Sequence, residues 1–126
     1  MLFRSQCSNV SGVDIEGFGN VHADVYKTIT PVQNTGYMIA DKLYYPGDAF
    51  YVPEKKVDVL ALPVAGPWLK VSEVLDFALA IKPRICFPVH DAMMKPGSNF
   101  GARISEMVLK PQGIAFTPME IGRAHV

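Results

Sequence analysis

The stretch Val57-Asp58-Val59-Leu60-Ala61-Leu62-Pro63-Val64 decides the fold of this chain. It is almost entirely apolar over the length of one strand, which predicts a central strand covered on both faces. A helix is predicted to follow over residues 72–81, and another strand over residues 85–89. Strands that alternate with helices form βαβ units, so this part of the chain predicts a parallel segment of sheet.

Apolar residues at helical spacing mark the two helices of this segment. The first is expected to begin with Ser72 as its N-cap and to end at Lys82-Pro83. The second is predicted over residues 100–109, and a last strand over 114–117. The inward face of the second helix is expected to comprise Ile104, Met107 and Val108.

The chain before residue 46 predicts short strands and one antiparallel hairpin. Short strands are expected over residues 10–13 and 18–24, with glycine-containing turns between them. Residues 35–40 and 43–45 are separated by the short connection Asp41-Lys42, which predicts a hairpin. The expected fold class is therefore α/β of the α+β type, with a mixed sheet and helices packed on one face.

Composition excludes several kinds of partner. Twelve lysines and arginines balance twelve acids, so no excess charge attracts nucleic acid or an anionic membrane. The hydrophobic share of 49% indicates a folded domain rather than a disordered chain. No apolar run approaches the ~18 residues of a membrane-spanning helix. Cys7 and Cys86 lie far apart and form no CxxC motif, so we expect a cytoplasmic chain with Cys86 in a buried strand.

The two ends of the chain share an unusual property in the codons that can encode them. Residues 1–5 can be written GTG CTC TTC CGA TCT, if the GTG start is read as Met. The reverse complement of that word lies within GAG ATC GGA AGA GCA CAC GTC, which encodes residues 120–126. The word is similar to a common short-read sequencing adapter. We therefore expect residues 1–5 and 120–126 to be non-native, and residues 6–119 to be cut from a longer gene.

Two side chains suited to binding metal follow predicted strands. Asp48 comes shortly after residues 43–45, and Gly47 before it lacks a side chain that would block an ion. His90 comes directly after residues 85–89. Ligands bind at the carboxyl ends of strands in open α/β sheets, and these oxygen and nitrogen donors suit zinc, iron or manganese. Each residue alone has a commoner structural explanation: Asp48 as a turn aspartate, and His90 as a histidine hydrogen-bonded to a backbone carbonyl. It is the placement of both after successive strands that favours a metal site.

His22 is the third candidate ligand, and it is expected near the end of a short strand. The alternative for His22 is a surface histidine or one that only supports a ligand. Asp24 and Asp91 could orient the imidazoles through the second ring nitrogen. Trp68 is expected to cover either the core or the mouth of a pocket. Neither a nucleophile-elbow motif nor a phosphate-loop motif occurs in the sequence.

Taken together, these residues resemble the C-terminal half of the metallo-β-lactamase superfamily, most closely its bacterial lactonase-like branch of metal-dependent hydrolases. A Gly-Asp after a strand, then Asp-x-Leu-x-Leu-Pro, then Pro-x-His form a fairly specific series. The stretches that carry the resemblance occur in the expected order: GNVHA (19–23), NTGYMI (34–39), YPGDAF (45–50), VDVLALP (57–63), PWLK (67–70) and FPVHD (87–91).

The resemblance implies half of an αββα sandwich with part of a dinuclear metal site. Asp48 corresponds to the carboxylate that bridges two metals. His90 corresponds to the histidine that completes the sphere of the second metal, and His22 to the one that completes the sphere of the first. The other ligands of the family come from an HxHxDH motif in the N-terminal half. This sequence lacks that motif, since His22 is followed by Ala23-Asp24-Val25.

The implied activity is hydrolysis of an ester, lactone, amide or phosphoester in a small-molecule substrate. Two divalent metal ions would activate water, with zinc expected and manganese or iron as alternatives. For this segment without its missing N-terminal half, we expect weak metal binding and no useful turnover. The alternative is a non-catalytic partial scaffold or binding domain with a degenerate metal site. Its exposed sheet edge and apolar face would favour a homo-oligomer.

Overall fold

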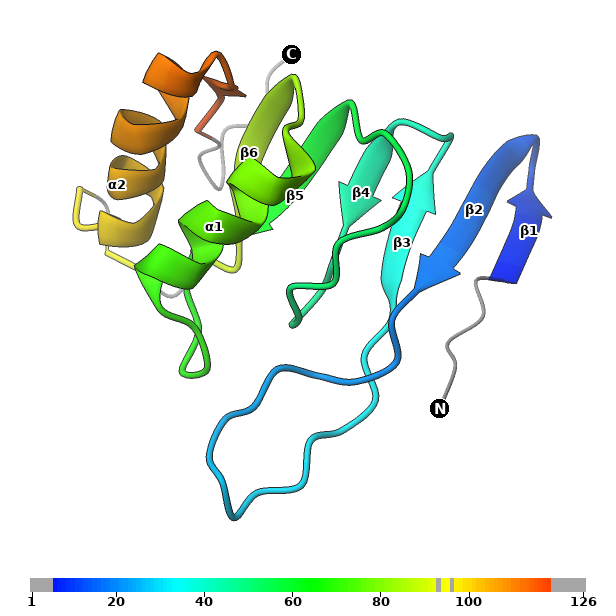
Figure 1. The fold of residues 1–126 in the computed structure, drawn as a ribbon, viewed down its shortest axis with the longest axis horizontal. Coiled ribbons are helices and arrows are strands. Elements are labelled where there is room, and N and C mark those ends of the chain that lie inside the picture. Colours follow the sequence, from blue (N-terminus) through cyan, green and yellow to red (C-terminus); the bar gives the residue numbers. More distant parts are fainter. Residues whose placement is uncertain (1–5, 93, 96, 119–126) are drawn as a thin grey trace.

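The computed structural model describes residues 6–92, 94–95 and 97–118, so the expected non-native ends lie outside the described residues. The described part forms one sheet with two helices (Figure 1). In chain order the elements are β1 (Gln6–Val10), β2 (Val13–Phe18), β3 (Gly36–Ile39), β4 (Leu43–Tyr45), β5 (Val59–Pro63), α1 (Val71–Ile81), β6 (Ile85–Val89), α2 (Phe100–Leu109), the short 3-10 helix η1 (Lys110–Gln112) and β7 (Ala115–Phe116).

The sheet has seven strands whose spatial order equals their order in the sequence. Strands β1 to β4 pair antiparallel, and β4 to β7 pair parallel. The predicted fold class, a mixed sheet in an α/β chain, is confirmed. Since β4, β5 and β6 run parallel, their carboxyl ends lie at the same edge of the sheet, and this edge carries the candidate site.

The core lies between one face of the sheet and the helices. The strand residues that contribute to it are fully or almost fully buried: Met38, Tyr44, Leu60, Leu62, Cys86 and Phe116. Helix α1 adds Val74, Phe77 and Ala78, and α2 adds Ala102 and Leu109. Both helices therefore cover the same face, as predicted. None of the described helices is long and apolar enough to cross a membrane.

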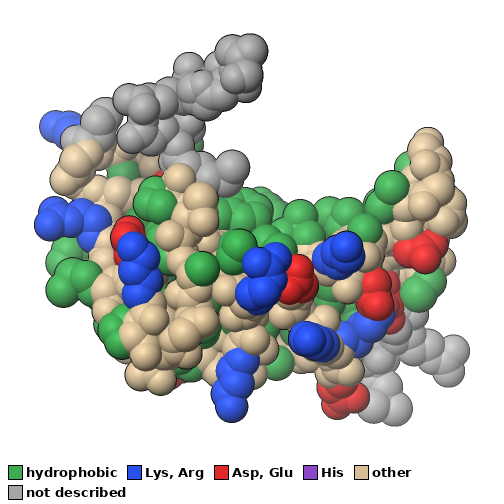
Figure 2. Space-filling model, turned by 90° about the horizontal axis from the view of Figure 1, so that it is seen from above, with side chains coloured by type: hydrophobic (Ala, Val, Ile, Leu, Met, Phe, Trp, Pro, Cys, Tyr) green, Lys and Arg blue, Asp and Glu red, His purple; other side chains and the backbone are tan. Residues whose placement is uncertain are grey.

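Four consecutive residues of β5, residues 60–63, are buried, which confirms the prediction of a central strand covered on both faces. The other face of the sheet nevertheless has none of the described helices over it (Figure 1). We call this the open face. In the register of the sheet it carries ten large apolar side chains between β2 and β6, of which Tyr37 is 45% and Val13 39% exposed and the others are half-buried. Seen from above, hydrophobic side chains line the hollowed border of the molecule away from the helices (Figure 2). The ten residues are Val13, Ile15, Tyr37, Ile39, Leu43, Tyr45, Val59, Ile85, Phe87 and Val89.

The first hairpin differs from the prediction. Residues 10–13 were predicted as a strand but hold the turn between β1 and β2, where Ser11 and Gly12 have positive φ angles of 50° and 86°. The predicted strand over 18–24 is wrong as well, because β2 ends at Phe18 and a long loop follows. The chain leaves the sheet at Gly19, whose φ is 73°. The β3–β4 hairpin is confirmed. In its connection, Ala40 and Asp41, which precede Lys42, lie in the left-handed conformation.

The two helices also correct details of the prediction. Helix α1 begins one residue before Ser72, with Lys70 at the N-cap and no side-chain capping bond. Helix α2 has the predicted bounds, but Met107 is 69% and Val108 37% exposed. The buried face instead comprises small residues and one leucine: Gly101, Ala102, Ser105 and Leu109. A Cβ on Gly101 would collide with the carbonyl oxygen of Val64, so the small residues face inward because α2 packs against backbone there.

Candidate metal site

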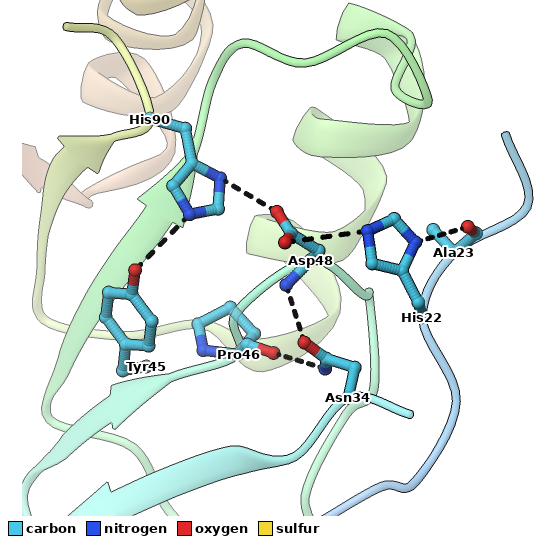
Figure 3. Close-up of polar contacts among 7 residues, drawn as sticks. All are labelled: His22, Ala23, Asn34, Tyr45, Pro46, Asp48 and His90. Carbon is cyan, nitrogen blue, oxygen red and sulfur yellow. Dashed lines mark hydrogen bonds and ion pairs between the residues drawn. The ribbon is translucent and has the colours of Figure 1, made fainter. Parts of the chain in front are cut away.

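The three predicted ligands meet at the carboxyl edge of the parallel strands. The carboxylate of Asp48 lies between two imidazoles, one from each side (Figure 3). Its Oδ2 is 3.5 Å from Nε2 of His22, and its Oδ1 is 3.3 Å from Nδ1 of His90. The sequence therefore predicted correctly that these residues, far apart along the chain, come together.

Asp48 is fixed by a side chain from a neighbouring loop. Asn34 accepts a hydrogen bond from the Asp48 backbone N–H at 2.9 Å and donates one to the carbonyl oxygen of Pro46 at 3.0 Å. Gly47 between them has a φ of 73°, and a Cβ there would lie 2.5 Å from Oδ1 of Asn34. Glycine is therefore required twice, for the left-handed backbone and for the close approach of the amide.

His22 lies in the loop between β2 and β3, not at a strand end as predicted. The loop is tied down by backbone bonds from His22 N to Val32 O at 2.9 Å and from Ala23 N to Asp48 O at 2.8 Å. The ring atom Nδ1 is 2.6 Å from the carbonyl oxygen of Ala23. Because a carbonyl only accepts, this contact assigns the proton of a neutral ring to Nδ1. Nε2 then points its lone pair toward Asp48.

His90 directly follows β6, as predicted, and has a φ of 67°. A left-handed backbone is unfavourable for histidine, and such positions concentrate at functional sites. The hydroxyl of Tyr45 lies 3.3 Å from Nε2 of His90. The ring of His90 is thus held through one nitrogen by Tyr45 while the other faces Asp48.

The geometry of these atoms fits divalent metal ions. Two ligands bound at ~2.1 Å with tetrahedral angles lie ~3.4 Å from each other. The two separations between imidazole nitrogen and Asp48 oxygen, 3.5 and 3.3 Å, agree with that spacing. Each of the two imidazoles faces a different carboxylate oxygen of Asp48. No group of three His, Cys, Asp or Glu side chains that could hold one ion occurs within the described residues.

An open pocket of about 510 Å³ lies over these side chains. His22, Asp48 and His90 form its polar floor, and apolar residues form its wall: Val25, Ala65, Pro67, Trp68 and Ala92. The Trp68 ring packs edge-on against His22 with centroids 5.9 Å apart, and it also lies 5.0 Å from the ring of Phe50. Trp68 therefore lines the pocket, and it also contacts Phe50, which packs against the core.

Sequence reasoning missed the supporting roles of two residues and assigned roles to two others wrongly. The roles of Asn34 and Tyr45 depend on contacts between distant segments, and the only local signal was that each lies within a stretch that resembles the family. Asp24 and Asp91 were expected to orient the imidazoles. Instead, Ala23 and Tyr45 contact the second ring nitrogens, and Asp91 accepts a hydrogen bond from Asn99 at 2.8 Å.

Comparisons with known proteins find a family match and relatives for most of this chain. Residues 1–90 match the family described as beta-lactamase superfamily domain. Protein Rv0786c of Mycobacterium tuberculosis (strain ATCC 25618 / H37Rv) is 36% identical over 100 residues, which make up 74% of this chain and 47% of that protein. The chain thus spans about half the length of the curated relative it matches.

Two solved structures resemble the fold. Igni18, described as a novel metallo hydrolase from the hyperthermophilic archaeon Ignicoccus hospitalis, superposes with a TM-score of 0.65 at 16% identity, over 94% of this chain and 56% of that one. A putative Zn-dependent hydrolase of the metallo-beta-lactamase superfamily from Thermotoga maritima gives a TM-score of 0.46 at 19% identity, over 71% of this chain and 47% of that one.

Proposed function

We propose, since this chain belongs to the beta-lactamase superfamily, that it carries part of the dinuclear site of a metal-dependent hydrolase. The observation that carries the proposal is the position of Asp48, whose two carboxylate oxygens each face a different imidazole at metal-ligand spacing. A carboxylate used only as a turn residue has no reason to lie between two histidines from separate segments.

The three candidate ligands would have different roles at the two ions. Asp48 would bridge two divalent ions, His22 would bind one of them and His90 the other. The chemistry that the bound ions supply is a hydroxide nucleophile at neutral pH and polarisation of the scissile carbonyl or phosphoryl oxygen. Ala23 and Tyr45 hold the two rings in orientation, which preserves ligand geometry through the cycle. Trp68 and its apolar neighbours would present an apolar wall to the substrate on one side of the pocket.

A complete site requires further ligands beside those of this chain. Each ion would receive only two ligands from this chain, fewer than the three protein ligands of a typical catalytic zinc site. We assign the others to an HxHxDH segment in an N-terminal half, within an αββα sandwich of the lactonase-like branch. The bond hydrolysed is an ester, lactone, amide or phosphoester, and zinc is the expected metal, with manganese or iron as alternatives.

Activity tests this proposal in a chain extended upstream by coding sequence that carries the histidine motif. Such a protein should bind about two equivalents of divalent metal and hydrolyse a generic ester, lactone or phosphodiester. Asp48→Ala should abolish both metal binding and turnover, while Asp24→Ala, an exposed carboxylate outside the pocket lining, should leave them unchanged. An extended protein that contains the motif yet takes up no metal would refute the hydrolase assignment.

A second candidate is a non-catalytic partial scaffold or binding domain with a degenerate metal site. It is favoured by the lack, within the described residues, of any cluster of three side chains able to hold one ion. For the 126-residue chain itself this candidate and the hydrolase proposal agree on weak metal binding without useful turnover. They separate in the extended protein, which under the second candidate would bind metal weakly and turn nothing over.

A further inference from the structure

The pocket over the three candidate ligands has a wall of one chemical kind. Of the nine described residues that line it, all except His22, Asp48 and His90 are apolar or glycine. None of these nine described residues is a lysine or an arginine, so the lining offers a substrate no side-chain cation. The first turn of α1, whose backbone N–H groups could bind an anion, is not among them either. The lining therefore suits an uncharged group.

A charged phosphoryl substrate fits this lining poorly. Proteins bind phosphate oxygens with arginine, lysine or converging backbone N–H groups, and burying a charge without such partners is costly. The scissile group of a substrate would lie at the ligands of the floor, so the rest of the substrate has to match the wall. An aliphatic or aromatic substituent does so, because its contact with the wall removes apolar surface of both partners from water.

Trp68 is the largest side chain of the wall, and the core braces it. Its ring centroid lies 5.0 Å from that of Phe50, which in turn lies 5.1 Å from that of Phe77 on α1. Phe77 is a buried member of the core cluster. A Cβ on Gly66 would come within 2.9 Å of Nε1 of Trp68, so the preceding loop packs closely on the indole. An aromatic surface fixed in this way binds an apolar group with little further loss of side-chain entropy.

The pocket has the size of a small-molecule site. Its volume of about 510 Å³ lies within the ~300–1,000 Å³ of typical ligand pockets. Because the candidate ligands form its floor, a polypeptide segment that filled it would keep any substrate away from them. We infer, on the basis of the proposed hydrolase function, that the site takes an uncharged ester, lactone or amide and not a phosphoester. The aliphatic or aromatic substituent of that substrate lies against Trp68.

Fluorescence of the full chain tests the inference, because Trp68 is its single tryptophan and lies in the wall. γ-Valerolactone, γ-hexalactone and γ-octalactone, which differ in the length of an alkyl tail, are titrated with EDTA present and again with Zn²⁺. The dissociation constant should fall about two- to fourfold with each added methylene, as expected for a partly or fully buried CH₂ group. Phenyl phosphate, the anionic probe, should bind about tenfold more weakly than γ-octalactone, because its charge finds no partner in the wall.

Two aspartate substitutions in the loop between β2 and β3 provide a matched pair. Val25 lines the pocket and is 44% exposed, whereas Val32 is 67% exposed and is not among the lining residues. Val25→Asp should raise the dissociation constant of γ-octalactone about fivefold, since it replaces apolar wall by a charge. Val32→Asp adds the same charge to the same loop and should leave that constant unchanged. Because both side chains are exposed, both variants should fold, which circular dichroism verifies.

Three results would overturn the inference: lactone binding that does not strengthen with tail length, phenyl phosphate that binds as tightly as γ-octalactone, and equal effects of Val25→Asp and Val32→Asp. A failure of the proposed function gives a different result, since it appears as a chain without Zn²⁺ uptake. Zn²⁺ uptake without a preference for longer lactones overturns the substrate class alone. Tail-length dependence without Zn²⁺ uptake supports the apolar ligand and contradicts the hydrolase.

Discussion

At the scale of single residues, the position of Asp48 depends on how closely Asn34 approaches the backbone of Gly47. Gly47 and Gly113 both have φ angles near 80°, at 73° and 82°, but a Cβ on Gly113 would have nothing within 4 Å. A comparison of alanine at the two positions therefore separates the cost of the left-handed backbone from the cost of the close approach.

We predict that Gly113→Ala lowers the free energy of unfolding by about 1–2 kcal/mol, the cost of a left-handed alanine. Gly47→Ala should cost about 1–3 kcal/mol more, because its methyl group displaces the Asn34 side chain. Urea denaturation followed by circular dichroism measures both values. Equal losses at the two positions would show that the contact between Asn34 and the Asp48 loop contributes nothing.

The convergence of the candidate ligands was predictable at the residue scale, whereas the contacts that support them were not. Asp48 and His90 follow strands of a parallel segment, and the carboxyl ends of such strands meet at one edge by construction. The Tyr45 hydroxyl and the Asn34 amide act across separations of 45 and 14 residues. No local pattern in a sequence encodes such a contact before the fold is known.

At the scale of elements, β6 places Cys86 in the centre of the core, where burial raises the pKa of its thiol from 9.0 to about 12. The folded chain therefore keeps a proton that the unfolded chain releases above pH 9. This contribution to stability is complete below pH 9 and is lost as the pH rises toward 12. Burial also raises the pKa of Tyr44, which acts in the same direction at higher pH.

Between about pH 9 and about pH 10 the free energy of unfolding should consequently fall by about 1 kcal/mol through Cys86 alone. Chemical denaturation at several pH values measures this slope. Cys86→Ala should reduce the slope, and Cys7→Ala, at the exposed cysteine, should leave it unchanged. A slope that Cys86→Ala does not alter would contradict a buried, protonated thiol.

Elements with strong periodic patterns were predictable, and those set by backbone packing were not. The apolar run of β5, the spacing in α1 and the turn between β3 and β4 each fixed an element close to its observed bounds. The face of α2 was predicted wrongly because hydrophobicity favoured Met107 and Val108, while the close approach at Gly101 required small residues. The strand around His22 was predicted wrongly because an isolated apolar alternation does not specify a partner strand.

At the scale of the whole molecule, the two faces of the sheet differ in what covers them. One face packs against α1 and α2. The parallel strands of the sheet lead into Asp48 and His90 at their carboxyl ends. The open face leaves Tyr45 half-buried while its hydroxyl contacts His90. Any partner that covers the open face therefore also removes Tyr45, and with it one support of the site, from water.

Titration of the full chain with Zn²⁺ in a calorimeter tests the central claim most directly, because stoichiometry does not depend on the identity of any substrate. We predict two weak sites in the chain as it stands, one in His22→Ala, one in His90→Ala and none in Asp48→Asn. Asp24→Asn, the matched control, should keep both. If Asp48→Asn retains both sites, or if neither histidine variant loses one, the carboxylate does not bridge two ions and the proposed centre is contradicted.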